Sequence, residues 1–157
     1  EVEDLAGFHS RIEEPTRTTY RGIDVYKAGF WTQGPVLLQA LNIVEGYDLQ
    51  ALGHNSPGYI HLLAEAMKLA FADREWYYAD PDFVGVPQQG LLSKEYAAKR
   101  RDLIDLEHAS TTLRPGNPYP FQPQQAEHRP IPKAIDFRPG EVGTTGTRVA
   151  DAEGNVF

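Results

Sequence analysis

The chain has 157 residues, of which 41% are hydrophobic and 24% charged, a composition typical of a globular protein rather than of a disordered chain. Its net charge of -7 argues against sequence-independent binding of nucleic acid, which requires clustered Lys and Arg side chains. These residues include no Cys, which excludes disulfides, thiolate zinc sites and Cys nucleophiles, and none of their apolar runs is long enough to span a membrane.

The N-terminal part of the sequence predicts a short helix, one strand and a loop. The short helix is expected around residues 4–8. Ile23 and Val25 alternate with polar residues, which predicts a half-buried strand over residues 20–28. Residues 30–35, with the sequence FWTQGP, are expected to form the loop that follows this strand.

Three helices are expected after the loop. Pro35 suits the first turn of the first helix, and Gly46 suits its C-terminal cap. The Ser-Pro pair at 56–57 favours the start of the second helix, which should end near Tyr78 because Pro81 disfavours helical geometry at the residue before it. The third helix is expected over residues 93–106, with Ser93 as its N-terminal cap.

Apolar spacing predicts which faces of these helices point inward. The second helix is the best defined, and its apolar stripe is Ile60, Leu63, Met67, Ala70 and Phe71. Its polar residues that lie mostly away from the stripe are His61, Glu65, Lys68 and Asp73. The residues expected to face inward on the third helix are Leu92, Tyr96, Ala97, Leu103 and Ile104.

The composition of the sequence changes after the third predicted helix. Seven of the 12 prolines lie between 115 and 139, interleaved with Gln, which predicts an extended, exposed linker over residues 108–143. A strand is expected over residues 145–151, followed by a turn at 152–155 and the return strand of a β-hairpin. The sequence therefore divides into 1–107, the linker 108–143 and 144–157.

Most other candidate sites have a simpler structural explanation. The five His residues, at 9, 54, 61, 108 and 128, show no close metal-binding spacing. We therefore expect them to have surface or capping roles and do not expect a metal site. Asp80 and Asp82 flank a proline, which favours a turn over a pair of catalytic carboxylates. The aromatic cluster of Trp76, Tyr77, Tyr78 and Phe83 lacks interleaved basic residues, so core packing is expected rather than base stacking.

The sequence Gly143-Thr144-Thr145 is a candidate of another kind. Two Thr residues alone indicate only β-propensity. Their position after a small residue, at the end of a linker and the head of a strand, suits an internal cleavage point. Cleavage there would free an α-amino group, which can act as the base for the hydroxyl of its own Thr.

Several stretches of this sequence resemble γ-glutamyltranspeptidases. The first is the strand region from Tyr20 to Tyr26, and the second, at 34–49, reads GPVLLQALNIVEGYDL. The most specific stretch, at 61–87, reads HLLAEAMKLAFADREWYYADPDFVGVP and continues through 93–104. The start of the family's small subunit is similar to TTGTRVADAEGN at 144–155. The resemblance covers most of the chain outside the proline-rich linker.

The resemblance implies an α+β fold, here a part of the four-layer αββα sandwich of N-terminal nucleophile hydrolases. That part would be mainly helical, with the start of a terminal β-hairpin. It further implies that residues 1–107 end the large subunit and that 144–157 begin the small subunit. By its seven-residue distance to Asp151, Thr144 is the expected nucleophile, and the bond from Gly143 to Thr144 is the expected cleavage site.

The implied activity is acyl transfer without a cofactor or a metal. The Thr144 hydroxyl would attack the γ-glutamyl carbonyl of glutathione or a similar amide, while backbone N–H groups hold the oxyanion. The acyl group would then pass to an amino acid, a peptide or water. The implied partners are these small molecules and the remainder of both subunits. The family's other substrate-binding regions are not among these residues, so this segment alone is not expected to be active. The resemblance also implies a periplasmic or secreted protein.

Three departures from the family pattern leave the substrate open. The sequence FWTQGP at 30–35 stands where relatives often have PPSSGG, Gly146 where they often have His, and Arg148 where they often have Ser or Thr. These differences suggest a divergent subgroup with another acyl donor. The alternatives are a related amide acylase, for example one acting on a β-lactam side chain, or an unprocessed, non-catalytic homologue that serves as a binding module.

Overall fold

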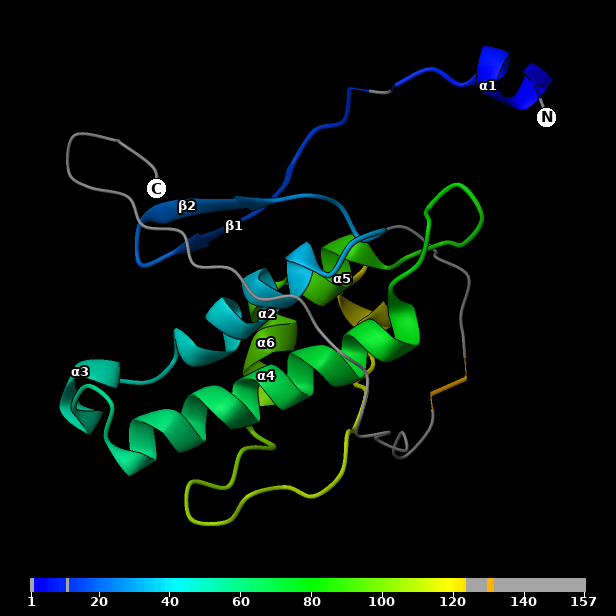
Figure 1. Ribbon diagram of the computed structural model, residues 1–157. Helices are drawn as coiled ribbons and strands as arrows, with labels where there is room; N and C mark the ends of the chain where they lie inside the picture. Colours follow the sequence, from blue (N-terminus) through cyan, green and yellow to red (C-terminus); the bar gives the residue numbers. More distant parts are fainter. Residues whose placement is uncertain (1, 11, 124–129, 132–157) are drawn as a thin grey trace, which may run out of the picture.

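The computed structural model describes residues 2–10, 12–123 and 130–131 of the chain (Figure 1). The elements of this part, in chain order, are α1 (Val2–Gly7), β1 (Thr16–Tyr20), β2 (Ile23–Lys27), α2 (Gly34–Val44), α3 (Leu49–Leu52), α4 (Pro57–Tyr77), α5 (Gln88–Leu92), α6 (Lys94–Arg101) and the 3-10 helix η1 (Tyr119–Phe121). Helices dominate and the two strands form an antiparallel sheet, so the predicted α+β composition is confirmed.

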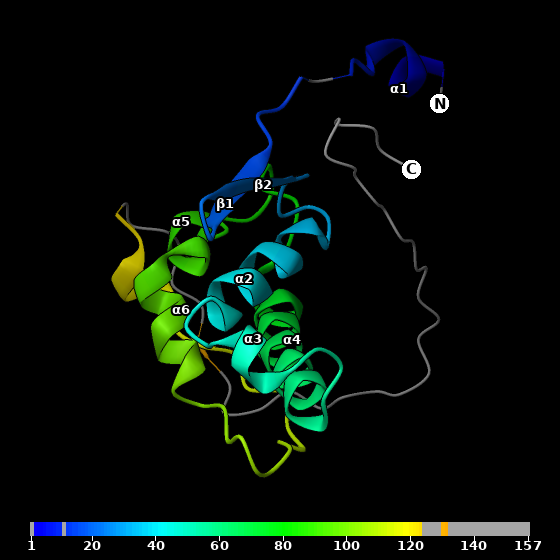
Figure 2. The same ribbon diagram turned by 90° about the vertical axis from the view of Figure 1, so that its left-hand side faces the viewer.

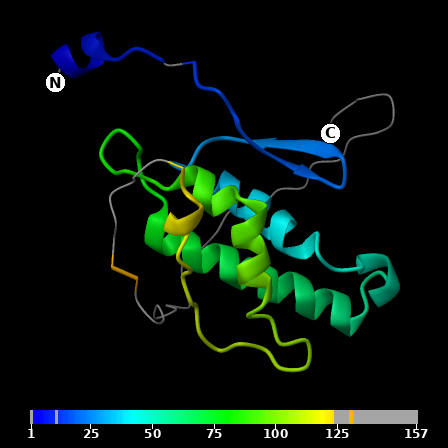
Figure 3. The ribbon, with the colours of Figure 1, turned by 180° about the vertical axis from the view of Figure 1, so that it is seen from behind.

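The helices α2, α4 and α6 form the body of the molecule. The long helix α4 runs beside α2 (Figures 1 and 3), and α6 packs on α2 from the other side (Figure 2). The β-hairpin lies across α2, while α1 stands apart from the other helices at the end of an extended segment (Figure 2). No helix in the described part of the chain combines the length and the apolar character needed to cross a membrane.

The single strand expected over residues 20–28 is in fact the second half of a hairpin. Arg21 and Gly22 have φ angles of 49° and 84°, as in the two-residue turn that joins antiparallel strands. The expected half-burial is also wrong for this strand, because Ile23 is 66% exposed. The hairpin is anchored mainly by β1, whose Thr18 is only 7% exposed and contacts α2.

Helix α2 begins as the sequence predicts, with Pro35 in its first turn. The predicted role of Gly46 is wrong, since its φ is not positive and the helix ends with Glu45 in a right-handed conformation. A Cβ atom at Gly46 would lie only 2.0 Å from the guanidinium carbon of Arg101. A larger residue at position 46 would therefore displace the Arg101 side chain from its present position.

Helix α4 has the predicted ends but not the predicted inner face. The Ser56 hydroxyl accepts a hydrogen bond from the Tyr59 amide, and the helix ends before Tyr78.

The inward stripe predicted for α4 is turned relative to the real one. Ile60 and Met67 are 56% and 47% exposed, whereas Glu65 and Asp73 are 3% and 0% exposed. Ala70 is buried as predicted. The two carboxylates can lie inside because the Ser110 amide and Lys68 contact Glu65, and Arg100 contacts Asp73.

Helix α6 begins at its predicted cap and ends earlier than predicted. The Ser93 hydroxyl accepts from the Tyr96 amide, which confirms the cap. The helix ends at Arg101 rather than at residue 106. Beyond Arg101 the backbone amides donate hydrogen bonds to carbonyls three residues earlier, as the Leu103 amide does to the Arg100 carbonyl, and such bonds end an α-helix. Leu103 is consequently 41% exposed, contrary to its predicted inward position.

The first part of the predicted linker is packed against the helices. Leu113 is 8% exposed, Pro118 is fully buried, and the rings of Tyr119 and Phe121 pack against the aromatic core around Tyr96. The expected exposed, extended conformation is therefore wrong from residue 113 to residue 121. The predicted strand at 145–151 and turn at 152–155 lie outside the described residues.

Candidate functional site

Gly143 and Thr144, the predicted cleavage site and nucleophile, lie outside the described residues, as does His128. Their roles stay predictions. The described part contains three arrangements of polar side chains that have to be considered instead: a buried hub around Asp73, a polar network around Lys94, and an open groove near the N-terminus.

The buried hub centres on the carboxylate of Asp73, which is fully shielded from solvent. One carboxylate oxygen accepts hydrogen bonds from the Tyr96 hydroxyl at 2.8 Å and the Gln39 amide at 3.1 Å. The other accepts from the Gly116 amide at 2.8 Å and forms an ion pair with Arg100 at 3.2 Å. The hub thus joins α2, α4, α6 and the segment after α6 at one point.

Burial dominates the electrostatics of this hub. Desolvation raises the pKa of Asp73, while Arg100, the Gly116 amide, Tyr96 and Gln39 lower it. Burial also raises the pKa of the Tyr96 phenol, and the neighbouring Asp73 charge raises it further. With Asp73 at 0% and Arg100 at 3% exposure, neither side chain can reach a substrate from this position. The hub is therefore suited to holding four segments together and not to chemistry on a bound molecule.

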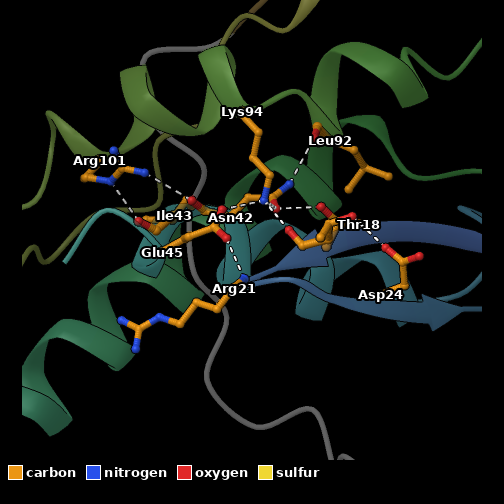
Figure 4. A network of polar contacts seen from close by, with 10 residues as sticks. Thr18, Arg21, Asp24, Asn42, Ile43, Glu45, Leu92, Lys94 and Arg101 are labelled. Carbon is orange, nitrogen blue, oxygen red and sulfur yellow. Dashed lines mark hydrogen bonds and ion pairs between the residues drawn. The ribbon is translucent and has the colours of Figure 1, made fainter. Parts of the chain in front are cut away.

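The second network surrounds the amine of Lys94 at the start of α6 (Figure 4). The amine donates at 2.6 Å to the Thr19 carbonyl on β1, the Asn42 side-chain oxygen and the Glu45 carboxylate on α2. The Thr18 hydroxyl donates to the same Asn42 oxygen at 2.7 Å. Three elements that are distant in sequence are tied together by this one side chain.

The network continues along the C-terminal end of α2. Glu45 accepts a hydrogen bond from the Arg21 amide at 2.8 Å, and this bond, followed by the one from Lys94, lowers the pKa of Glu45 below its usual value. Arg101 donates to the Ile43 carbonyl at 2.8 Å (Figure 4). The carbonyls at the end of a helix lack intrahelical partners, and Arg101 satisfies two of them, because it also donates to the Asn42 carbonyl at 3.2 Å.

An open groove of about 560 Å³ lies between the N-terminal segment and two loops. Its lining includes Phe8, His9, Glu13, Glu14, Trp31, Asp80 and Asp82. Asp80 accepts a hydrogen bond from the Asp82 amide at 2.9 Å, which confirms the predicted turn role of this pair. Glu13 accepts from the Trp31 indole at 2.9 Å. The groove walls carry exposed carboxylates, which suit contact with cationic groups.

The His residues considered as candidate ligands in the sequence make contacts with neighbouring residues of the fold. His61 is within 2.8 Å of the Asp105 carbonyl, His108 lies 3.2 Å from the Asp105 carboxylate, and the His54 ring packs on Tyr59. Within the described ranges, no three His, Asp or Glu side chains are grouped so that they can hold a metal ion.

The predicted packing of the aromatic cluster is confirmed only in part. Tyr77 is buried, and Trp76 and Tyr78 pack against the core, but Phe83 is 85% exposed. Phe83 lies beyond the end of α4, in a turn closed by its own amide and the Asp80 carbonyl, so it does not follow the helix into the core.

Residue-by-residue reading of the sequence did not identify the organising side chains Asp73, Arg100, Asn42, Glu45 and Lys94 as partners. The one available signal was the AFADR stretch at 70–74, which places a charged pair inside an otherwise apolar helix turn. Such a charge is a sign of a buried, paired group.

All 157 residues match the family model described as gamma-glutamyltranspeptidase. Among curated proteins, the chain is 46% identical over 109 residues to an acylase ACY 1 proenzyme of Pseudomonas sp. strain SE83, which covers 69% of this chain and 20% of that protein. It is 40% identical over 129 residues to a glutathione hydrolase proenzyme of Escherichia coli K12, covering 80% and 22%. It is 34% identical over 155 residues to a glutathione hydrolase proenzyme of Bacillus subtilis subsp. natto, covering 98% and 26%.

Solved structures give the same result. A gamma-glutamyltranspeptidase of Helicobacter pylori superposes with a TM-score of 0.70 at 36% identity, over 80% of this chain and 36% of that chain. A cephalosporin acylase from Bacillus halodurans superposes with a TM-score of 0.67 at 41% identity, over 74% and 21%. The chain spans about a fifth to a quarter of the length of the curated relatives it matches.

Proposed function

Because the chain belongs to the gamma-glutamyltranspeptidase family, we propose that it contributes to an enzyme that cleaves its own precursor and transfers acyl groups through Thr144. The observation that carries this proposal is the extent of the match. An alignment over 155 residues with a glutathione hydrolase proenzyme covers 98% of this chain and so extends across the region of Gly143 and Thr144. The sequence around them, TTGTRVADAEGN, resembles the start of the family's small subunit, with departures at Gly146 and Arg148.

The proposed self-cleavage begins with the Thr144 hydroxyl. Its oxygen attacks the Gly143 carbonyl carbon, the peptide bond to the Thr144 nitrogen breaks, and the nitrogen takes the proton from the hydroxyl. The resulting ester is hydrolysed by water, which leaves a carboxylate on Gly143 and a free α-amino group on Thr144. That amine now lies beside the hydroxyl it serves as a base.

In the mature enzyme the same hydroxyl attacks the carbonyl of a γ-glutamyl amide. The amine accepts the hydroxyl proton and delivers it to the departing amine of the substrate, so a γ-glutamyl ester of Thr144 remains. An amino acid, a peptide or water then attacks the ester and regenerates the hydroxyl. Oriented backbone N–H groups would stabilise the oxyanion in each step.

The described residues support this chemistry as a scaffold. The Asp73 hub and the Lys94 network fix α2, α4, α6 and the hairpin relative to one another. Acyl transfer by an N-terminal Thr needs this rigidity, because catalytic geometry must be held to within a fraction of an ångström.

The decisive experiment uses the full-length protein. We expect a denaturing gel to show two chains, with Thr144 at the N-terminus of the smaller one when that chain is sequenced. The Thr144→Ala variant should remain a single chain, and Thr144→Ser, which keeps a hydroxyl, should still cleave. Cleavage of Thr144→Ala at the same bond would refute the assignment and make Thr145 the next candidate. A single uncut wild-type chain would favour the non-catalytic homologue.

A second candidate function is the hydrolysis of another amide, such as the side chain of a cephalosporin. It is favoured by the 46% identity to an acylase proenzyme, which exceeds the 40% identity to the Escherichia coli glutathione hydrolase proenzyme. The two functions are separated by assaying processed, full-length protein with a γ-glutamyl anilide and with a side-chain-acylated cephalosporin. Faster turnover of the cephalosporin would identify the acylase, and Thr144→Ala supplies the blank for both substrates.

A further inference from the structure

The segment from residue 113 to residue 122, which we call the anchor segment, packs against three helices. Its 3-10 helix η1, gold in Figure 3, lies beside α5. The contacts with the helices are a hydrogen bond from the Gly116 amide to Asp73 on α4 at 2.8 Å, one from the Gly90 amide on α5 to Gln122 at 2.7 Å, and the packing of Phe121 on Tyr96 of α6, with ring centroids 5.8 Å apart.

The buried ion pair of the helical body is incomplete without the anchor segment. Asp73 and Arg100 are 0% and 3% exposed, so each depends on protein groups for its hydrogen bonds. The anchor segment supplies one partner to each of them. The Gly116 amide donates to Asp73, and the Arg114 carbonyl accepts from Arg100. Until the segment docks, a buried carboxylate and a buried guanidinium both lack a partner, which disfavours close packing around them.

The anchor segment lies on the chain between the helices and the proposed cleavage site. Twenty-one residues, 123–143, separate it from Thr144. Cleavage between Gly143 and Thr144 leaves the anchor segment on the same chain as the helices, so its contacts with them need not break. Self-cleavage requires precise placing of the attacking hydroxyl, and a completed fold is what supplies such precision.

We propose that the anchor segment must dock on α4, α5 and α6 before the precursor cuts itself, so that only chains with a completed core are processed. This inference rests on the proposed self-cleavage between Gly143 and Thr144. A segment that served only as packing would raise the stability of the protein and have no specific effect on the rate of cleavage. The two roles are therefore separated by comparing cleavage rates among variants that disturb different parts of the fold.

Gly90→Ala disturbs the surface on which the anchor segment docks. A Cβ atom at Gly90 would lie 2.4 Å from the Pro118 carbonyl oxygen, a backbone atom that cannot rotate away. Gly58→Ala is the matched control, because Gly58 also lies in a helix and its nearest contact would be a Leu52 methyl group at 3.7 Å. Both substitutions raise the helix propensity in the same way, so that effect cancels in the comparison.

Two further variants separate docking from stability. Replacement of residues 118–122 by Gly and Ser at the same length removes the buried proline, both rings and Gln122 from the anchor segment. Thr18→Ala removes a buried hydrogen bond to Asn42 at the junction of the hairpin with α2, and leaves every contact of the anchor segment in place. It lowers stability without touching the docked segment.

Two measurements on the full-length protein complete the test. In the Thr144→Ala background, where no catalysis is needed, hydrogen exchange of the Gly116 amide shows whether the anchor segment is docked. With Thr144 intact, a pulse of cell-free synthesis followed by a denaturing gel gives the rate at which the precursor cuts itself. Because the observed rate follows the docked fraction, a variant that is mostly undocked should cut about tenfold more slowly or worse.

We expect Gly90→Ala and the Gly-Ser replacement to exchange faster at Gly116 and to cut at least about tenfold more slowly. Gly58→Ala and Thr18→Ala should cut at the rate of the wild type. Cleavage of the Gly-Ser replacement at the wild-type rate would overturn the inference and leave the proposed function intact. Equal slowing in Thr18→Ala would also overturn it, because cleavage would then follow stability alone. An uncut wild type would refute the proposed function and this inference together.

Discussion

The buried carboxylate of Asp73 is stabilised by several hydrogen-bond donors of the protein rather than by solvent. Four groups from α2, α6 and the segment after α6 satisfy its two oxygens, and the strongest of them is the ion pair with Arg100. Removal of one partner from a buried pair leaves the other charge without compensation in a medium of low polarity. A substitution of Asp73 should therefore lower the free energy of unfolding by more than the lost hydrogen bonds alone contribute.

We predict that Asp73→Ala lowers the free energy of unfolding by about 3–5 kcal/mol. The measurement is urea denaturation of the uncleaved Thr144→Ala protein, so that subunit dissociation does not contribute. The matched control is Lys99→Ala, which breaks the ion pair between Lys99 and Asp102. The side chains of these two residues are 72% and 70% exposed. This control should change the free energy by no more than about 1 kcal/mol. Equal effects of the two substitutions would contradict the structural role of the hub.

At the scale of the elements, the junction of α2 with the hairpin depends on Glu45. Its carboxylate receives the Arg21 amide at the hairpin turn and the Lys94 amine from α6. Both contacts favour the ionised form and hold the pKa of Glu45 below its usual value. The unfolded chain lacks these contacts, so protonation of Glu45 is easier in the unfolded state.

We therefore predict a loss of stability in acid that is specific to Glu45. The contribution of this group is fully present above the usual pKa of a Glu and is lost as the pH falls through the lowered pKa in the folded state. Glu45→Gln should remove this part of the pH dependence, which is measured by denaturation between neutral and acidic pH. Lys94→Met should raise the pKa of Glu45 in an NMR titration. Identical acid profiles for the wild type and Glu45→Gln would count against this assignment.

The starts of the helices were easier to predict than their inner faces. The caps at Ser56 and Ser93 act through bonds to amides three residues away, so local sequence is enough to place them. The inner face of α4 depends instead on partners far along the chain, such as Arg100 for Asp73. Apolar spacing treats every carboxylate as solvent-exposed, and so it placed Met67 inside and Asp73 outside.

At the scale of the whole molecule, the segment from residue 113 to residue 122 closes the core. The Gly116 amide donates to Asp73, the Tyr77 hydroxyl donates to the Gly116 carbonyl at 2.7 Å, and Gln122 accepts from the Gly90 amide at 2.7 Å. Gly90 allows this approach, because a Cβ atom there would lie 2.4 Å from the Pro118 carbonyl oxygen. The proline-rich sequence therefore contains a packed part before any linker begins.

We predict that hydrogen exchange distinguishes this packed part from the loop before it. The amides of Gly116 and Gly90 should exchange as slowly as those in the middle of α4, because their bonds open only when the core opens. The amides of Glu107 and His108, which bond to the exposed Asp105, should exchange much faster. NMR or mass spectrometry of the full-length protein reads both sets in one experiment. Fast exchange at Gly116 would mean that the segment is detached in solution.

Family membership and the helix starts could be recognised in the sequence, because each depends on residues within a short stretch of chain, and the cleavage site at 143–144 stays a prediction from the same kind of pattern. The role of Thr144 remains a prediction, since this residue lies outside the described part of the chain. The burial of Asp73 and the packing of residue 116 required the folded chain. They depend on bonds such as those from Gly116 to Asp73 and from Lys94 to Asn42, which join residues 43 and 52 positions apart. Local patterns carry no information about such pairs, because burial of a polar group is favourable only once its distant partner is in place.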